Sequence, residues 1–285
     1  MNLGILNLGL LNKDIDPHVS LQQTILEAQH ADAIGISRYW LAEHYGDNCA
    51  WTYSLPLAGI LLASTKKICI GTGGVLLRHH QPYRVACDAK FLNSTYPDRF
   101  ELGLGRGSAE YPWNTVLPTT GSDYNQQIEE LLGHLQYKSK VYNGQTFLNA
   151  LPAKGISPKL WMLASGHHSI KLAEHFGLPL CMSLFHSQDL PENINHNMNL
   201  FLAIAGSCGE SKTVAESQLQ KEDLFFWPKV IGNGNECLLQ LECIRQHYNA
   251  DGVIFAELVN DHNYRMNSMN LLAAAAAQGE PQIQN

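Results

Sequence analysis

Short apolar runs alternate with longer amphipathic runs along most of the chain. The short runs are typical of buried β-strands, and they span residues 3–8, 39–42, 68–77, 100–104, 160–164, 180–184, 199–205 and 253–257. The longer runs carry apolar residues at helical spacing, and they span residues 18–34, 55–63, 83–96, 123–137, 168–176, 235–248 and 262–277. Strands that alternate with helices in this way predict an α/β fold built on a parallel sheet.

The alternation fits two architectures, a closed (β/α)8 TIM barrel and an open doubly wound sheet. The length of 285 residues suits a single barrel domain. The pattern by itself leaves the choice between the two architectures open.

Composition excludes several classes of protein. Hydrophobic residues make up 45% of the chain, so disorder is excluded as the main state. The net charge of −7 excludes a large basic surface for nucleic acid or an anionic membrane. Charged residues are only 16%, which favours an oligomer. The seven cysteines form no C-x-x-C pair, and we see neither a signal peptide nor a membrane span, so we expect a soluble cytoplasmic protein.

The first candidate segment follows the second predicted strand and contains Glu43, His44 and Tyr45. The carboxyl ends of barrel strands carry catalytic residues. A neutral imidazole at that position could donate or accept a proton near neutral pH. Hydrogen bonds at a strand end could equally account for His44, so spacing alone leaves its role open.

Two further segments could bind a phosphate. Arg106 stands among glycines at the end of the fourth predicted strand, and its guanidinium suits a phosphate, although the run matches neither a P-loop nor G-x-G-x-x-G. Ser165, Gly166 and Ser169 lie where the fifth strand runs into a helix, whose first N–H groups can bind an anion. Each segment alone could be an ordinary turn or helix cap. On adjacent barrel strands, both could reach one phosphate.

Metal binding and serine hydrolysis are not indicated. The pairs His79-His80 and His167-His168 lack the H-x-x-x-H spacing and the carboxylate of a typical site, so we expect no metal. The chain also lacks a G-x-S-x-G elbow, which a serine nucleophile of an α/β-hydrolase would need.

Longer motifs surround these candidate residues. They comprise Ala42-Glu43-His44, residues 70–77, His80-Gln81-Pro82, residues 96–107 and Gly177-Leu178-Pro179. On these motifs the chain resembles the bacterial luciferase-like flavin monooxygenase family, from near the N-terminus to about residue 184 and again over residues 232–276. The resemblance implies a TIM barrel rather than an open sheet. We therefore expect one TIM-barrel domain over residues 1–278 and a flexible tail over residues 279–285.

The resemblance also implies a cofactor and an activity. Such barrels bind reduced FMN supplied by a separate reductase and use O2 to oxidise a small organic or carrier-bound substrate. They commonly pair as dimers through two early helices, here near residues 21–34 and 55–63. The homodimer, like the reductase, is thus implied by the family.

Site residues follow from the resemblance position by position. His44 resembles the family's catalytic histidine, Glu43 lies behind it, and Tyr45 and Tyr111 line the pocket. For the cofactor, the resemblance implies a bulge under the flavin ring, often with a cis peptide, at Gly73 and Gly74. It implies phosphate ligands at Arg106, Ser165, Gly166 and Ser169. It places Ser183 and Leu184 beside the ring.

Two departures from the family keep other functions open. Tyr45 stands where the luciferase subgroup has a second histidine, and a phenol with a pKa of about 10 is a donor rather than a base at neutral pH. The connection between the sixth and seventh strands is short for a parallel crossover, and residues 206–234 are short for a substrate lid. The alternatives are a non-catalytic flavin-binding or structural subunit and a deazaflavin-dependent oxidoreductase.

Overall fold

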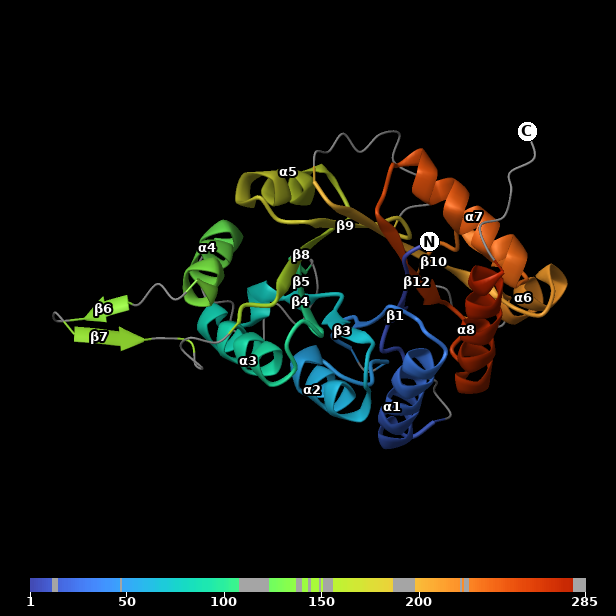
Figure 1. The fold of residues 1–285 in the computed structure, drawn as a ribbon, viewed down its shortest axis with the longest axis horizontal. Coiled ribbons are helices and arrows are strands. Elements are labelled where there is room, and N and C mark those ends of the chain that lie inside the picture. The colour runs from blue at the N-terminus through green and yellow to red at the C-terminus, as the bar shows by residue number, and fades with distance from the viewer. Residues whose placement is uncertain are drawn as a thin grey trace.

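Eight parallel strands close into a barrel that is surrounded by helices (Figure 1). The computed structural model describes residues 1–11, 15–46, 48–107, 123–136, 140–142, 145–148, 150, 156–186, 198–220, 222 and 226–278. The barrel strands are β1 (Leu3–Asn7), β2 (Arg38–Leu41), β3 (Cys69–Thr72), β5 (Phe100–Gly105), β8 (Lys159–Ala164), β9 (Leu180–Ser183), β10 (Leu200–Cys208) and β12 (Gly252–Glu257). Strand β12 pairs with both β10 and β1, and β9 pairs with β10, which closes the ring. The predicted TIM barrel is confirmed.

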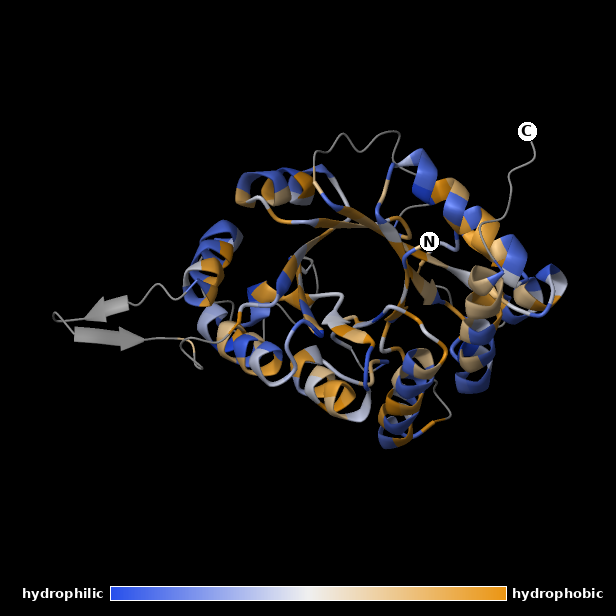
Figure 2. Cartoon of the chain, in the orientation of Figure 1, coloured by the Kyte–Doolittle hydropathy of each residue, from blue (hydrophilic) through white to orange (hydrophobic). Residues whose placement is uncertain are grey.

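The helices expected from the apolar spacing all form, with small shifts at their ends. They are α1 (Pro17–Ala33), α2 (Ser54–Ser64), α3 (Pro82–Thr95), α4 (Tyr124–Leu135), α5 (His167–Phe176), α7 (Gly234–His247) and α8 (His262–Ala277). Each of these helices buries several side chains, and Figure 2 shows apolar and polar residues on different sides of α4 and α5. A capping box between Asn233 and Glu236 begins α7, and the Asp261 side chain caps α8.

Several shorter elements were not predicted. They are β4 (Val75–Leu76), the 3-10 helix η1 (Leu77–His79), the antiparallel pair β6 (Lys140–Tyr142) and β7 (Gln145–Leu148), α6 (Lys212–Leu219) and β11 (Val230–Gly232). The seventh predicted strand, residues 199–205, in fact continues to Cys208, and β11 pairs with this extension. Residues 206–234, which are short for a substrate lid, therefore contain helix α6 and strand β11.

The prediction of one unbroken strand over residues 68–77 is wrong. The run breaks at Gly73–Gly74, whose peptide bond is cis, as the resemblance implied. Glycines allow a close approach of backbones here: a Cβ on Gly103 would collide with the carbonyl oxygen of Thr72, and one on Gly74 would lie 2.8 Å from the oxygen of Gly103. The apolar pattern continues through the break, so it did not reveal it.

Alternation along the strands divides the core into two layers. One layer fills the barrel interior and includes Trp40, Trp161 and Phe201, with ring centroids 5.8 Å apart for Trp40–Trp161 and 4.9 Å for Trp161–Phe201. The Trp40 Nε1 donates to Glu101, which also pairs with Arg38. These groups close the amino-terminal end of the barrel and leave the opposite end for chemistry.

The remaining expectations are tested only in part. Residues 187–197 of the connection between β9 and β10 lie outside the described residues, as do Tyr111 and the expected tail over residues 279–285. The assignment of residues 1–278 to one domain stays a prediction. No helix in the described ranges is long and apolar enough to cross a membrane. All seven cysteines fall within those ranges, and each is a free thiol.

Candidate active site

His44 lies just beyond β2, and its orientation is set by a backbone carbonyl. Its Nδ1 is 2.9 Å from the oxygen of Leu8, which follows β1. A carbonyl oxygen only accepts, so in the neutral ring Nδ1 carries the proton and Nε2 carries the lone pair. Burial lowers the pKa of His44, more than the Leu8 bond and the charge of Glu43 raise it. The ring is therefore neutral at pH 7, and its Nε2 can accept a proton.

Aromatic side chains surround His44, and the sequence did not single them out. The ring of Phe226 lies 6.0 Å from that of His44, centroid to centroid. Phe185 and His186 pack against Phe226 with centroids 4.9 Å and 5.4 Å away. Burial and the nearby His44 lower the pKa of His186. A signal existed, because Phe185 and His186 directly follow the sixth predicted strand.

Glu43 is buried and connects three segments. Its carboxylate accepts hydrogen bonds from His80 Nε2 at 2.5 Å and from the Tyr45 hydroxyl at 3.1 Å. The backbone N–H of Leu76, in β4, lies 3.4 Å away. Burial and the charge of Glu43 raise the pKa of Tyr45, so this phenol acts as a donor and not as a base, as expected.

His80 extends this network toward α3. Its ring stacks on Tyr53 with centroids 4.6 Å apart, and the Tyr53 hydroxyl donates to Asp88 at 2.6 Å. The sequence placed His80 in a motif without giving it a role. In the structure, His80 precedes α3 and its hydrogen bond to Glu43 connects the start of this helix to the end of β2.

The candidate phosphate residues lie at the ends of two neighbouring strands. Arg106 follows β5 with an exposed side chain, and Ser165 and Gly166 follow β8, which pairs with β5. Helix α5 begins with Gly166 as its N-cap, and no side chain caps it within the described chain. The alternative interpretation, in which Ser165 or Ser169 only caps the helix, is not supported. The first N–H groups of α5 are available to an anion.

The candidate residues for the flavin ring lie on β3–β4 and β9. The hydroxyl oxygen of Ser183 is buried and has no hydrogen-bond partner among the described residues, whereas the N–H of Leu184 is bound to the oxygen of Ala203 at 2.9 Å. A buried hydroxyl of this kind calls for a polar ligand atom. Together with an uncapped helix end and a nearby arginine, it fits a phosphorylated ring cofactor.

The described residues do not form a metal site. The described segments contain no group of three or more His, Cys, Asp or Glu side chains arranged to hold one. The candidate site is built instead from His44, the hydrogen bonds of the buried Glu43 carboxylate and a candidate anion site.

Comparison with known proteins identifies the family. A family model described as luciferase-like monooxygenase matches residues 1–206. The chain belongs to this family. Protein YvbT of Bacillus subtilis strain 168, itself uncharacterized, is 32% identical over 186 residues, which cover 64% of this chain and 54% of YvbT. The N-acetyl-S-alkylcysteine monooxygenase of the same organism is 27% identical over 191 residues, which cover 65% and 57%. This luciferase-like chain thus matches little more than half the length of either relative.

Solved structures share the whole barrel. The apo form of MsnO8 superposes with a TM-score of 0.83 at 23% identity and covers 98% of both chains. The oxygenating constituent of 3,6-diketocamphane monooxygenase from Pseudomonas putida, solved with FMN, gives 0.77 at 13% identity and covers 99% and 100%. An F420-dependent secondary alcohol dehydrogenase gives 0.69 at 16% identity and covers 96% and 98%. At these identities the likeness establishes the fold alone.

Proposed function

We propose that this luciferase-like protein is an FMN-dependent monooxygenase. It uses reduced FMN, delivered by a separate reductase, and O2 to oxidise a small organic or carrier-bound substrate. The observation that carries the proposal is His44, a neutral imidazole with its Nδ1 proton bound to Leu8 and its Nε2 lone pair left as acceptor. It stands at the end of the barrel where the family's enzymes act.

The chain offers a complete set of residues for the cofactor. Arg106 and the start of α5, with Ser165, Gly166 and Ser169, would hold the phosphate. Gly73, Gly74, Ser183 and Leu184 would contact the ring. The bound reduced flavin supplies two electrons, so that one oxygen atom of O2 enters the substrate and the other leaves as water. The relatives named as monooxygenases and the neighbour solved with FMN support this assignment.

The remaining site residues prepare the pocket for that chemistry. His44 accepts a proton at Nε2, and its lowered pKa keeps it neutral for this step. Phe185 and Phe226 are buried beside it and exclude water, which strengthens electrostatic interactions in the pocket. The Tyr45 hydroxyl donates a hydrogen bond, and Glu43 holds Tyr45 and His80 in place.

Two variants test the roles of His44 and Arg106. Each is titrated anaerobically with reduced FMN and then assayed with O2, a flavin reductase and an N-acetyl-S-alkylcysteine as first substrate. His44→Ala should bind reduced FMN as the wild type does and lose about 100-fold or more in turnover. Arg106→Ala should weaken FMN about tenfold or more and leave riboflavin, which lacks the phosphate, unchanged. Full turnover by His44→Ala contradicts the proposal.

The same titration decides between this proposal and the other two functions. Tighter binding of F420 than of FMN would indicate a deazaflavin-dependent oxidoreductase. Tight binding of reduced FMN without product from any substrate of a thioether, aldehyde and ketone panel would indicate a flavin-binding subunit.

We further propose that the protein is a homodimer. Large apolar side chains are exposed on three consecutive helices: Leu26 on α1 is 51% exposed, Ile60 on α2 is 49% and Phe91 on α3 is 61%. Two of these helices cover the ranges in which the family pairs. A contact between copies would remove this apolar surface from water.

A further inference from the structure

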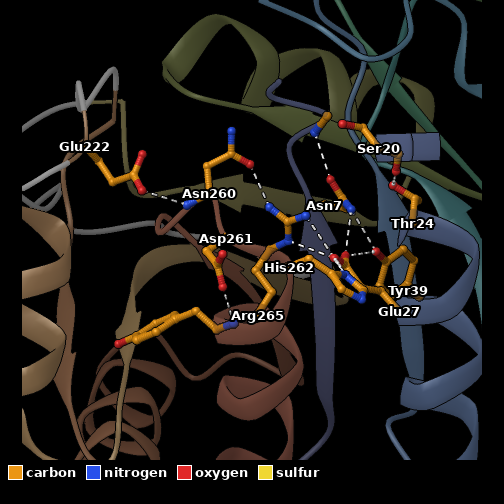
Figure 3. Close-up of polar contacts among 12 residues, drawn as sticks. Asn7, Ser20, Thr24, Glu27, Tyr39, Glu222, Asn260, Asp261, His262 and Arg265 are labelled. Carbon is orange, nitrogen blue, oxygen red and sulfur yellow. Dashed lines mark hydrogen bonds and ion pairs between the residues drawn. The ribbon is translucent and has the colours of Figure 1, made fainter. Parts of the chain in front are cut away.

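A buried carboxylate joins the first and last elements of the barrel. Glu27 of α1 accepts hydrogen bonds at Oε2 from Asn7 Nδ2 (3.1 Å) and the Tyr39 hydroxyl (2.9 Å). At Oε1 it accepts from His262 Nδ1 and Arg265 Nε, both at 2.9 Å (Figure 3). We call these five residues the Glu27 cluster. Its members come from β1, α1, β2 and α8.

The cluster fixes the orientation of the Asn7 amide. Asn7 Nδ2 donates to both Glu27 and the Tyr39 hydroxyl, the latter at 2.8 Å. With its NH2 group held there, Asn7 presents its Oδ1 to the N–H of Gly9 at 2.9 Å. A flipped amide would put donors against that N–H and an oxygen against the carboxylate, so the charge of Glu27 selects one orientation.

The Gly9 N–H belongs to the same peptide unit as the Leu8 carbonyl. A trans peptide is planar, with its N–H and C=O pointing in opposite directions. Asn7 therefore holds one side of this plane, and His44 Nδ1 binds the other side at 2.9 Å. Rotation of the Leu8–Gly9 peptide would remove the acceptor that keeps the proton of His44 on Nδ1.

Hydrogen bonds also lead from the cluster to the connection between α6 and β11, which contains Phe226. Arg265 Nη1 donates to Asn260 Oδ1 at 2.7 Å, and the Asn260 N–H donates to Glu222 at 3.0 Å (Figure 3). Glu222 lies in the connection between α6 and β11, four residues before Phe226, which packs on His44. One buried carboxylate is thus linked by hydrogen bonds to the Leu8–Gly9 peptide and, through Arg265 and Asn260, to Glu222.

We infer that the Glu27 cluster sets the tautomer of His44, with Asn7 as the positioning residue. The cluster orients Asn7, Asn7 orients the Leu8–Gly9 peptide, and this peptide keeps the proton on Nδ1 and the lone pair on Nε2. A role of His44 as proton acceptor in turnover rests on the proposed function. The tautomer itself does not, because it is set in the protein without flavin or substrate.

The test is Asn7→Leu, which keeps the branched shape of the side chain and removes the amide. Protein with ¹⁵N-labelled histidine is studied by NMR without cofactor, and His44 signals are assigned by their loss in His44→Ala. The matched control is Asn93→Leu, because the Asn93 amide also donates two hydrogen bonds, to the carbonyls of Ile156 and Ser157 on another side of the barrel. Asn7→Ala, which lets water reach Glu27, replaces Asn7→Leu if the latter does not fold.

The wild type and Asn93→Leu should show His44 mainly as the Nδ1–H tautomer. In Asn7→Leu the ratio of Nδ1–H to Nε2–H should fall about fivefold or more, as expected for one lost hydrogen bond. An unchanged ratio in a folded Asn7 variant overturns the inference, whatever its activity. If the wild type shows no turnover while Asn7→Leu still shifts the ratio, only the proposed function is refuted.

Discussion

Replacement of Arg265 by methionine should destabilise the protein far more than the loss of a surface ion pair. The guanidinium donates to Glu27 through Nε and lies 2.9 Å from the same oxygen through Nη2. The two side chains are only 18% and 2% exposed. Removal of one partner of a buried pair costs about 3–5 kcal/mol, because the other charge stays buried without compensation. The free energy of unfolding at pH 7 should fall by this amount, which corresponds to a drop in Tm of at least about 5 °C.

The pH dependence of this loss has a definite sign. Burial raises the pKa of Glu27, but the charge of Arg265 and the hydrogen bonds from His262, Arg265 and Tyr39 together lower it below its usual 4.5. A carboxylate with a lowered folded-state pKa stabilises the fold above its unfolded pKa, and this stabilisation is lost as the pH falls through the folded pKa. In Arg265→Met the pKa of Glu27 rises, and the side chain can take up a proton instead of remaining charged. The difference in stability between wild type and variant should therefore shrink from pH 7 to pH 4.

Thermal unfolding followed by circular dichroism at both pH values measures this effect. Arg245→Met is the matched control, because Arg245 pairs with Glu242 on the same helix and is 24% exposed. Its loss should be smaller, because Arg245 and Glu242 lie one turn apart on α7, where such a pair contributes about 0.2–0.5 kcal/mol. A loss at Arg265→Met that is no larger than the control, or one that grows on acidification, would falsify the reasoning.

Three further predictions concern packing, pH and assembly. Gly103→Ala should abolish soluble expression, because its Cβ would meet a carbonyl oxygen of β3, whereas Gly133→Ala in open space on α4 should raise Tm slightly. Burial raises the pKa of Glu257 to about 7. The stability that this side chain contributes when protonated is therefore lost as the pH rises from 5 to 7. Over this range the Tm of Glu257→Gln should fall less than the Tm of the wild type. The double variant Ile60→Lys, Phe91→Lys should halve the mass seen by light scattering at micromolar concentration, and a monomeric wild type would contradict the dimer.

The barrel was predictable because its signals are periodic and local. Each barrel strand is a short apolar run, and each large helix is a longer run with buried residues at helical spacing, so the two kinds of element could be told apart along the chain. The elements that were not predicted from the sequence lack these signals. Helix α6 is mostly polar, with only Ala215 and Leu219 buried, and β11 has three residues. The apolar pattern also missed the break at Gly73–Gly74, which only the family resemblance implied, because apolar residues continue on both sides of it.

The site was predictable only where its residues are adjacent in the chain. Glu43, His44 and Tyr45 were found as one segment at a strand end. Their partners come from elsewhere: a backbone carbonyl at Leu8 carries no side-chain signal, and Phe226 lies in a connection without periodicity. Such contacts depend on how barrel closure brings β1, β2 and the β10–β11 connection together.

Glu27 is an instructive case because the sequence did contain a signal. It stands on the same face of α1 as Thr24, Ala28 and Ala31, which are all buried, so a charge there needs partners. Those partners lie some 12 to 238 positions away along the chain, which periodicity cannot identify. A charged residue on the buried face of a helix therefore predicts a buried polar cluster but not its members.

Barrel closure and the orientation of the candidate base depend on the same carboxylate, yet the two effects should separate. Arg265 compensates the charge of Glu27 and touches Asn7 only through it, so Arg265→Met removes stability while Asn7 still has an acceptor for its NH2 group. Among the five residues of the Glu27 cluster, Asn7 is the one with a hydrogen bond to the peptide that binds His44. The tautomer of His44 should therefore respond more strongly to Asn7→Leu than to Arg265→Met, although the arginine variant should be the less stable of the two. The reverse order would mean that the cluster acts on His44 through general loosening of the barrel rather than through the Leu8–Gly9 peptide.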